Sequence, residues 1–264
     1  MFNLSNLAEA RPKVVRMTLG CVITYLFMVI MNFLANYLPI NDILTQEISD
    51  KYYNIFTPAG FTFIIWGVIY LLLGLLIIFL VRGVLKRRER PERVVKAIAW
   101  PFMISSLLNG VWILAWHYDQ ILLSTVLMLG ILVALIKLYV NLKNLYFRSK
   151  KYLIPFSVYL GWITVATVAN ITVLTVALEW GQFGLADEFW LGVVLLATIV
   201  ITGYMLFRQQ DVVFGLVILW AVTGIFAARL QEAEGLSAAA ALALVTGILV
   251  VIMIVQSKRR EKSF

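Results

Sequence analysis

Aromatic side chains recur at helical spacing in three apolar segments of the sequence, and two of these segments also contain an asparagine. The positions that would share one helix face in each segment are, in chain order, Trp66 and Tyr70; Asn109, Trp112 and Trp116; and Tyr159, Trp162, Ala166 and Asn170. Large rings beside small residues, with few polar groups, suit the binding of a planar amphipathic molecule by stacking. The same spacing also suits ordinary packing between helices, so each segment alone leaves both alternatives open. Because the three segments accompany one another, we favour a binding pocket.

Asparagine side chains within the apolar segments narrow these alternatives. An amide inside a lipid bilayer must find a hydrogen-bond partner, so Asn109 should face protein or a cavity and turn the neighbouring rings the same way. Asn32 and Asn36, in an earlier apolar segment, would either add polar contacts to a cavity or bond to a neighbouring helix. His117 is the single histidine and has no second metal donor near it in the sequence, so we expect it at the rim of a helix and not in a metal site.

The elements that must position these residues are membrane-spanning helices. Hydrophobic residues make up 62% of the 264 residues and charged residues only 14%, which is more apolar surface than a soluble domain of this length can bury. Strand-like alternation is absent, so the expected fold is an all-α, polytopic membrane helix bundle. About eight segments are long enough to cross a hydrocarbon core of ~30 Å. They are residues 16–38, 58–82, 97–117, 121–147, 153–178, 188–207, 212–230 and 237–256.

The formal net charge of +8 is distributed in a way that indicates membrane topology and not nucleic-acid binding. Lysine and arginine gather before the first expected span and in every second connection after it, while the other connections are acidic or mixed. By the positive-inside rule, this alternation places both termini in the cytoplasm of a multi-pass cell-membrane protein. The basic connections would face the anionic headgroups of the lipid bilayer, and no nucleic acid is expected as a partner.

The positions of the acidic residues limit the functions that the spans could perform. All 14 aspartate and glutamate residues lie outside the expected spans or at their ends. Ion-coupled transporters and intramembrane proteases usually depend on ionisable groups deep in the bilayer. We therefore do not expect an enzyme. A transporter or permease subunit that moves a hydrophobic small molecule by passive or partner-driven movement is the alternative to a binding protein.

Three segments resemble the signature helices of the tryptophan-rich sensory protein family, whose members are also called translocator proteins or peripheral benzodiazepine receptors. The segments are "FTPAGFTFIIWGVIY", "LNGVWILAW" and "VYLGWITVATVAN", and they occur in the order and spacing of the family within residues 50–172. The sequence departs from the family pattern at Ala59, which replaces the second proline of a Pro-Pro pair, at Phe61, which replaces a tryptophan, and at Val158, which replaces a proline.

The resemblance implies a five-helix bundle, residues 1–178, followed by a C-terminal extension of three membrane-spanning helices, residues 179–264. It implies a cavity that opens toward the loop of residues 39–56 and binds a small hydrophobic planar ligand such as a porphyrin or a haem-like tetrapyrrole. The ligand-binding positions that the family motifs assign are Trp66, Tyr70, Asn109, Trp112, Tyr159, Trp162 and Asn170. The expected function is that of a membrane sensor or receptor that needs no cofactor, and the three extra helices would be a coupling or partner surface. Family members often dimerise, so a homodimer or a membrane-protein partner is also expected.

Overall fold

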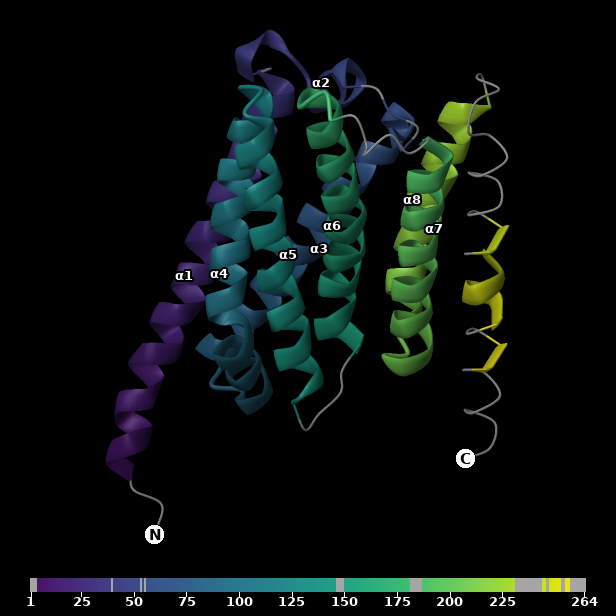
Figure 1. The fold of residues 1–264 in the computed structure, drawn as a ribbon. Helices are drawn as coiled ribbons and strands as arrows, with labels where there is room; N and C mark the ends of the chain where they lie inside the picture. The colour runs from purple at the N-terminus through teal and green to yellow at the C-terminus, as the bar shows by residue number, and fades with distance from the viewer. Residues whose placement is uncertain are drawn as a thin grey trace. The chain divides into compact units, whose positions relative to one another are not determined.

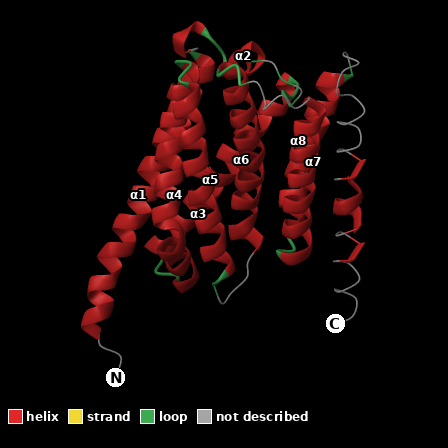
Figure 2. Ribbon diagram, viewed as in Figure 1, coloured by secondary structure: helices red, strands yellow, loops and turns green. Residues whose placement is uncertain are grey.

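Every regular element in the described part of the chain is a helix (Figure 2). The computed structural model describes residues 4–38, 40–52, 54, 56–145, 150–180, 187–230, 244–245, 247–252 and 255–256. The elements are α1 (Leu4–Tyr37), η1 (Ile40–Asp42), α2 (Thr45–Lys51), η2 (Gly60–Ile64), α3 (Ile65–Leu85), α4 (Glu89–His117), α5 (Ile121–Lys143), α6 (Lys150–Ala177), α7 (Asp187–Gly203), η4 (Tyr204–Arg208) and α8 (Val212–Arg229). Since no strand occurs among these residues, the expected all-α fold class is confirmed.

Six helices in the described residues are long and apolar enough to cross a membrane. They are Arg11–Tyr37, Gly60–Leu85, Glu89–His117, Ile121–Lys143, Lys150–Ala177 and Val212–Arg229, and they match the first five expected spans and the seventh. The sixth expected span corresponds to α7, which continues into the π-helical turn η4 and has a shorter apolar part, Leu196–Arg208. The eighth expected span, residues 237–256, lies largely outside the described residues. The described helices therefore confirm a polytopic membrane bundle.

The helices group into two compact units, and each unit combines two stretches of the chain. The first unit consists of residues 1–45 and 66–159, and the second consists of residues 46–65 and 160–264. The helix α6 contributes to both, because the division falls between Tyr159 and Leu160. The expected division at residue 178 rests on the family resemblance and stays a prediction.

In the first unit, α4 packs closely against both α1 and α5 (Figure 1). The helix α4 begins with Glu89 and Glu92 in its first turn, where negative charge interacts favourably with the unpaired N–H groups. Small residues let it approach α1, since a Cβ atom at Gly110 would overlap the ring of Phe27. Helices in lipid gain much of their association energy from such close packing, so Gly110 supports the contact between α1 and α4.

In the second unit, α8 contacts both η2 and α7 (Figure 1). The helix α8 begins after Asp211, whose carboxylate accepts a hydrogen bond of 3.0 Å from the backbone N–H of Phe214. This N-cap satisfies one of the N–H groups that a helix leaves unpaired in its first turn. The start of α8 is therefore fixed by a hydrogen bond between residues three apart in the sequence.

We predict that Gly110→Ala destabilises the folded protein by ~1–3 kcal/mol, because the added methyl group forces the Phe27 ring out of its position. The matched control is Gly67→Ala in α3, where an added Cβ meets nothing within 4 Å. Thermal unfolding of both variants in the same detergent measures the difference. Equal melting temperatures for Gly110→Ala and Gly67→Ala would contradict the close packing of α1 on α4.

Candidate ligand-binding site

The indole of Trp66, at the start of α3, lies at the centre of an aromatic cluster in the first unit. Its ring centroid is 5.8 Å from that of Tyr70 with nearly parallel planes (21°), and 5.6 Å from that of Trp112. The phenol of Tyr159 meets the same indole edge-on at 6.4 Å. These separations lie within the range in which aromatic rings attract one another. Side chains from α3, α4 and α6 that are far apart in the sequence thus form one group of rings.

The stripe of rings on α4 continues from Trp112 to Trp116. Their indoles are stacked at 6.0 Å with an interplanar angle of 28°. The Nε1–H of Trp116 donates a hydrogen bond of 3.0 Å to the backbone carbonyl of Thr45. Trp116 is buried, so its indole packs inside the protein and does not face the lipid headgroups. The indoles of Trp112 and Trp116 thus connect the aromatic cluster with Thr45, the first residue of α2.

Asn109 joins three helices through hydrogen bonds within the first unit. Its Oδ1 accepts a bond of 2.8 Å from Nδ2 of Asn32 in α1, and its own Nδ2 donates a bond of 2.9 Å to the hydroxyl of Tyr159 in α6. The second N–H of the Asn32 amide bonds to the carbonyl oxygen of Met28 at 2.9 Å. Asn109 therefore holds α1, α4 and α6 together by hydrogen bonds, and it also fixes the Tyr159 ring that contacts Trp66.

A second polar connection runs from α1 to the end of α4. Asn36 donates to the carbonyl of Asn32 and accepts a hydrogen bond of 3.1 Å from the hydroxyl of Thr45. The same hydroxyl lies 2.9 Å from Nε2 of His117, and Nδ1 of His117 lies 3.1 Å from the carbonyl oxygen of Ile40. A carbonyl oxygen only accepts, so Nδ1 of His117 carries a proton. The Thr45 hydroxyl has one hydrogen, so it donates to Asn36 or to Nε2 of His117 but not to both at once.

His117 is the last residue of α4, as expected, but it is not exposed there, because only 1% of its surface is accessible. Both ring nitrogens are engaged by residues of the loop and of α2, so the ring has no nitrogen to offer as an axial haem ligand. In the described residues, no group of three or more His, Cys, Asp or Glu side chains could hold a metal ion. The role of His117 in the structure is to fasten the loop after α1 to the end of α4.

The hydroxyl of Tyr70 differs from the amides of Asn32 and Asn109 and the hydroxyl of Tyr159, which are hydrogen-bonded. Its oxygen is buried and has no hydrogen-bond partner among the described residues. The backbone carbonyl of the same residue is satisfied, since it accepts a bond of 2.8 Å from the hydroxyl of Tyr25. A buried polar group without a partner costs ~1–3 kcal/mol. A bound molecule with a polar substituent would remove that cost.

Five of the seven residues that the family motifs assign to ligand binding come together in the first unit: Trp66, Tyr70, Asn109, Trp112 and Tyr159. The other two, Trp162 and Asn170, belong to the second unit. The indole of Trp162 lies 6.1 Å from the ring of Phe63 in an edge arrangement, and the amide of Asn170 donates to the carbonyl of Ala166 one turn earlier. A ligand-binding role for these two residues stays a prediction from the resemblance.

Sequence reasoning missed Thr45, which links Asn36, His117 and Trp116. No local pattern marks this threonine, because its side-chain partners lie 9 and 72 residues away in the chain. The only sequence signal in this region was the pair Asn36 and His117, two polar residues at the ends of apolar segments that each needed a partner.

We predict that Asn109→Leu lowers the free energy of unfolding by ~1–3 kcal/mol, because it leaves the Asn32 amide and the Tyr159 hydroxyl without their partner. Replacing both members of a buried pair by apolar residues costs much less than replacing one. The double variant Asn32→Leu with Asn109→Leu should therefore recover part of the lost stability. A double-mutant cycle of thermal unfolding in detergent measures this coupling, and simple additivity of the two substitutions would contradict the hydrogen bond.

A model of the TSPO-like protein family matches residues 18–255. The match extends beyond residues 50–172, which carry the motif resemblance, and includes most of the three C-terminal helices expected from the sequence. The comparison gave no match among curated proteins and none among solved structures. Because the family model covers most of the chain, including the aromatic cluster around Trp66, the protein belongs to the TSPO-like protein family.

Proposed function

We propose that this protein is a membrane sensor that binds a planar hydrophobic ligand, such as a tetrapyrrole, at the aromatic cluster around Trp66. The observation that carries the proposal is the buried, unpartnered hydroxyl of Tyr70, which lies beside Trp66, while the nearby amide of Asn109 and hydroxyl of Tyr159 are hydrogen-bonded. Membership of the TSPO-like protein family and the multi-pass membrane architecture support the same function.

The chemistry of the cluster suits a flat molecule with a polar edge. The rings of Tyr70 and Trp112 lie 5.8 Å and 5.6 Å, centroid to centroid, from that of Trp66, and all three provide stacking surfaces. Stacking supplies affinity with little directional demand, while one hydroxyl can orient a carboxylate or carbonyl group of the ligand. A tetrapyrrole combines an extended aromatic plane with carboxylate side chains, so its two parts correspond to the two kinds of group in the cluster.

The proposal is one of binding and not of catalysis. The groups around Trp66 are rings, amides and phenol hydroxyls, and the nearest described histidine, His117, uses both ring nitrogens in hydrogen bonds. We further propose, from the charge pattern of the sequence, that the protein resides in the cell membrane with both termini in the cytoplasm. A homodimer or a membrane-protein partner stays a prediction from the family resemblance, as does the absence of a required cofactor.

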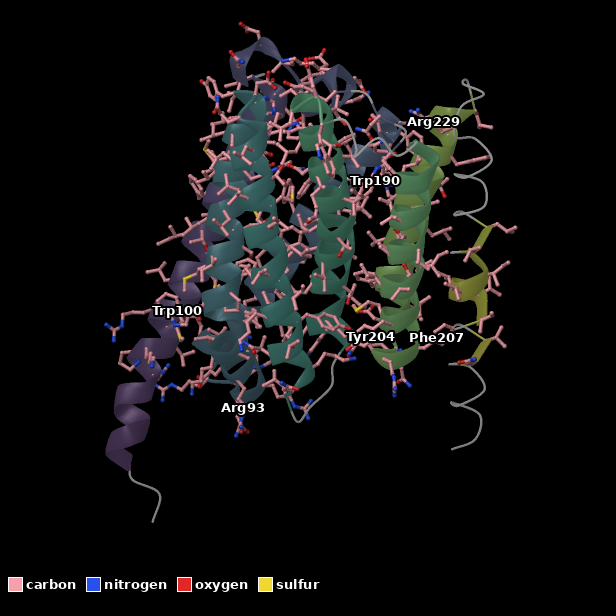
Figure 3. The ribbon with its side chains drawn as sticks, in the orientation of Figure 1. Arg93, Trp100, Trp190, Tyr204, Phe207 and Arg229 are labelled. Carbon is pink, nitrogen blue, oxygen red and sulfur yellow. The ribbon has the colours of Figure 1, made fainter. Side chains whose placement is uncertain are left out.

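We predict that Trp112→Ala weakens the binding of protoporphyrin IX about five- to a hundredfold, because the loss of one stacking indole costs ~1–3 kcal/mol. Titration of the purified protein in detergent, followed by tryptophan quenching, measures the dissociation constant. The matched control is Trp100→Ala, which removes an indole that is 64% exposed on α4 (labelled in Figure 3) and should leave the affinity unchanged.

Two outcomes of this titration would contradict the proposed function. Quenching that does not saturate, or an equal loss of affinity in Trp112→Ala and Trp100→Ala, would indicate that the porphyrin partitions into the detergent. Uptake of the ligand into proteoliposomes that responds to an ion gradient would instead favour the transporter alternative.

We predict that Tyr70→Phe weakens the binding of protoporphyrin IX about two- to tenfold, the range expected for the loss of one hydrogen bond. The same substitution should not lower the melting temperature of the free protein, because the hydroxyl has no partner to lose. Protoporphyrin IX dimethyl ester, which lacks free carboxylates, tests the nature of the contact. A melting temperature that falls together with the affinity would mean that the hydroxyl has a structural role and not a ligand-binding one.

A further inference from the structure

Residues 57–62, which lead into α3, are bound to α8 within the second unit. The backbone N–H of Ala59 donates a hydrogen bond of 3.0 Å to the carbonyl oxygen of Gly224. The indole Nε1–H of Trp220 donates a bond of 3.1 Å to the carbonyl oxygen of Thr62. An amide from outside a helix that bonds to a carbonyl in its interior requires a close approach of the two backbones. The contact between this segment and α8 is therefore made by main-chain groups and not only by apolar packing.

Two side chains of α8 reinforce the contact. Arg229, at one end of α8 (Figure 3), is only 2% exposed and directs its guanidinium toward the carbonyl oxygen of Thr57 at 3.4 Å. The ring of Phe61 meets the indole of Trp220 edge-on at 5.5 Å. A buried arginine in an apolar helix must be paired with protein groups, because lipid offers it none. Segment 57–62 supplies one of those groups.

Gly224 is the residue of α8 that makes this approach feasible. A Cβ atom at this position would overlap Oγ1 of Thr62, which is fully buried. Any larger residue would push segment 57–62 away from the helix and separate Ala59 from its acceptor. The absence of a side chain at Gly224 is thus a steric condition for the hydrogen bond that the Gly224 carbonyl accepts.

The segment continues into α3 without an intervening loop. The helical turn η2 ends at Ile64 and α3 begins at Ile65, whose backbone N–H bonds to the carbonyl of Thr62. The same carbonyl accepts the indole N–H of Trp220. One acceptor atom therefore links α8 to the first residue of α3.

We propose that α8 is an internal docking element of the second unit that holds segment 57–62 and, through Thr62, fixes Ile65, the first residue of α3. Gly224, Trp220 and Arg229 are positioning residues in this proposal. The docking does not depend on the proposed function. The inference gives a helix of the C-terminal extension a role that the five-helix family motifs do not contain.

The first test follows hydrogen exchange of the Ala59 amide in the full-length protein, labelled with ¹⁵N-alanine in detergent. Ala59 is a direct probe because its N–H bonds to α8. Trp220→Phe keeps an aromatic ring against Phe61 and removes only the N–H, and we expect it to speed the exchange of Ala59 about two- to tenfold. The amide of Ala115 in α4 should be unaffected, and identical Ala59 exchange rates in the wild type and in Trp220→Phe would overturn the docking.

A steric variant tests the same contact independently. Gly224→Ala should also speed the exchange of Ala59, and Thr62→Ala in the same chain should restore much of the protection, because it removes the atoms that the new methyl group meets. The matched control is Gly203→Ala in α7, where an added Cβ has open space around it. Failure of Thr62→Ala to rescue Gly224→Ala would show that the substitution acts by another route and would overturn the role of Gly224.

Discussion

Water is absent from the hydrocarbon core of a membrane, so every polar group that a helix carries into it must be satisfied by protein. In the first unit this constraint is met by the amides of Asn32 and Asn109 and the hydroxyl of Tyr159, which bond in series across α1, α4 and α6. These bonds have direction, unlike the apolar contacts around them. They therefore determine the rotation of the helices, and the position of the aromatic rings follows from that rotation.

The buried hydroxyl of Tyr70 does not meet this requirement for a hydrogen-bond partner within the protein. Near the aromatic cluster, the amides of Asn32 and Asn109 and the hydroxyl of Tyr159 are hydrogen-bonded, whereas the Tyr70 hydroxyl is not. Natural proteins rarely keep a buried polar group unpaired unless a further partner is involved. A ligand that stacks on Trp66 and bonds to Tyr70 would complete the hydrogen bonding of the cluster. Recognition by stacking and by one hydroxyl requires no acidic side chain within the membrane, and this agrees with the peripheral position of all acidic residues in the sequence.

In the second unit, main-chain groups form the hydrogen bonds between segments, a role that amide side chains have in the first unit. The carbonyl of Gly224 accepts from Ala59, and the carbonyl of Thr62 accepts from Trp220. The family match extends to residue 255 and so includes α8. The C-terminal helices thus belong to the part of the chain that the family model describes, and α8 contacts the segment that opens the first signature helix.

The sequence by itself determined the helical class, most of the spans and the set of rings that share each helix face, because these depend on composition and on periodicities of a few residues. It also determined that Asn109 cannot face lipid, since an amide there would lack a partner. Only the tertiary structure decided which partners Asn109 has and that His117 is buried. It also decided that Thr45 joins His117 to Asn36 of α1. It also assigned Trp162 and Asn170 to a different unit from Trp66. Features of this kind depend on contacts between residues far apart in the sequence, such as that of Asn32 with Asn109, 77 residues apart. No local pattern encodes such a contact, because it exists only after the helices have packed.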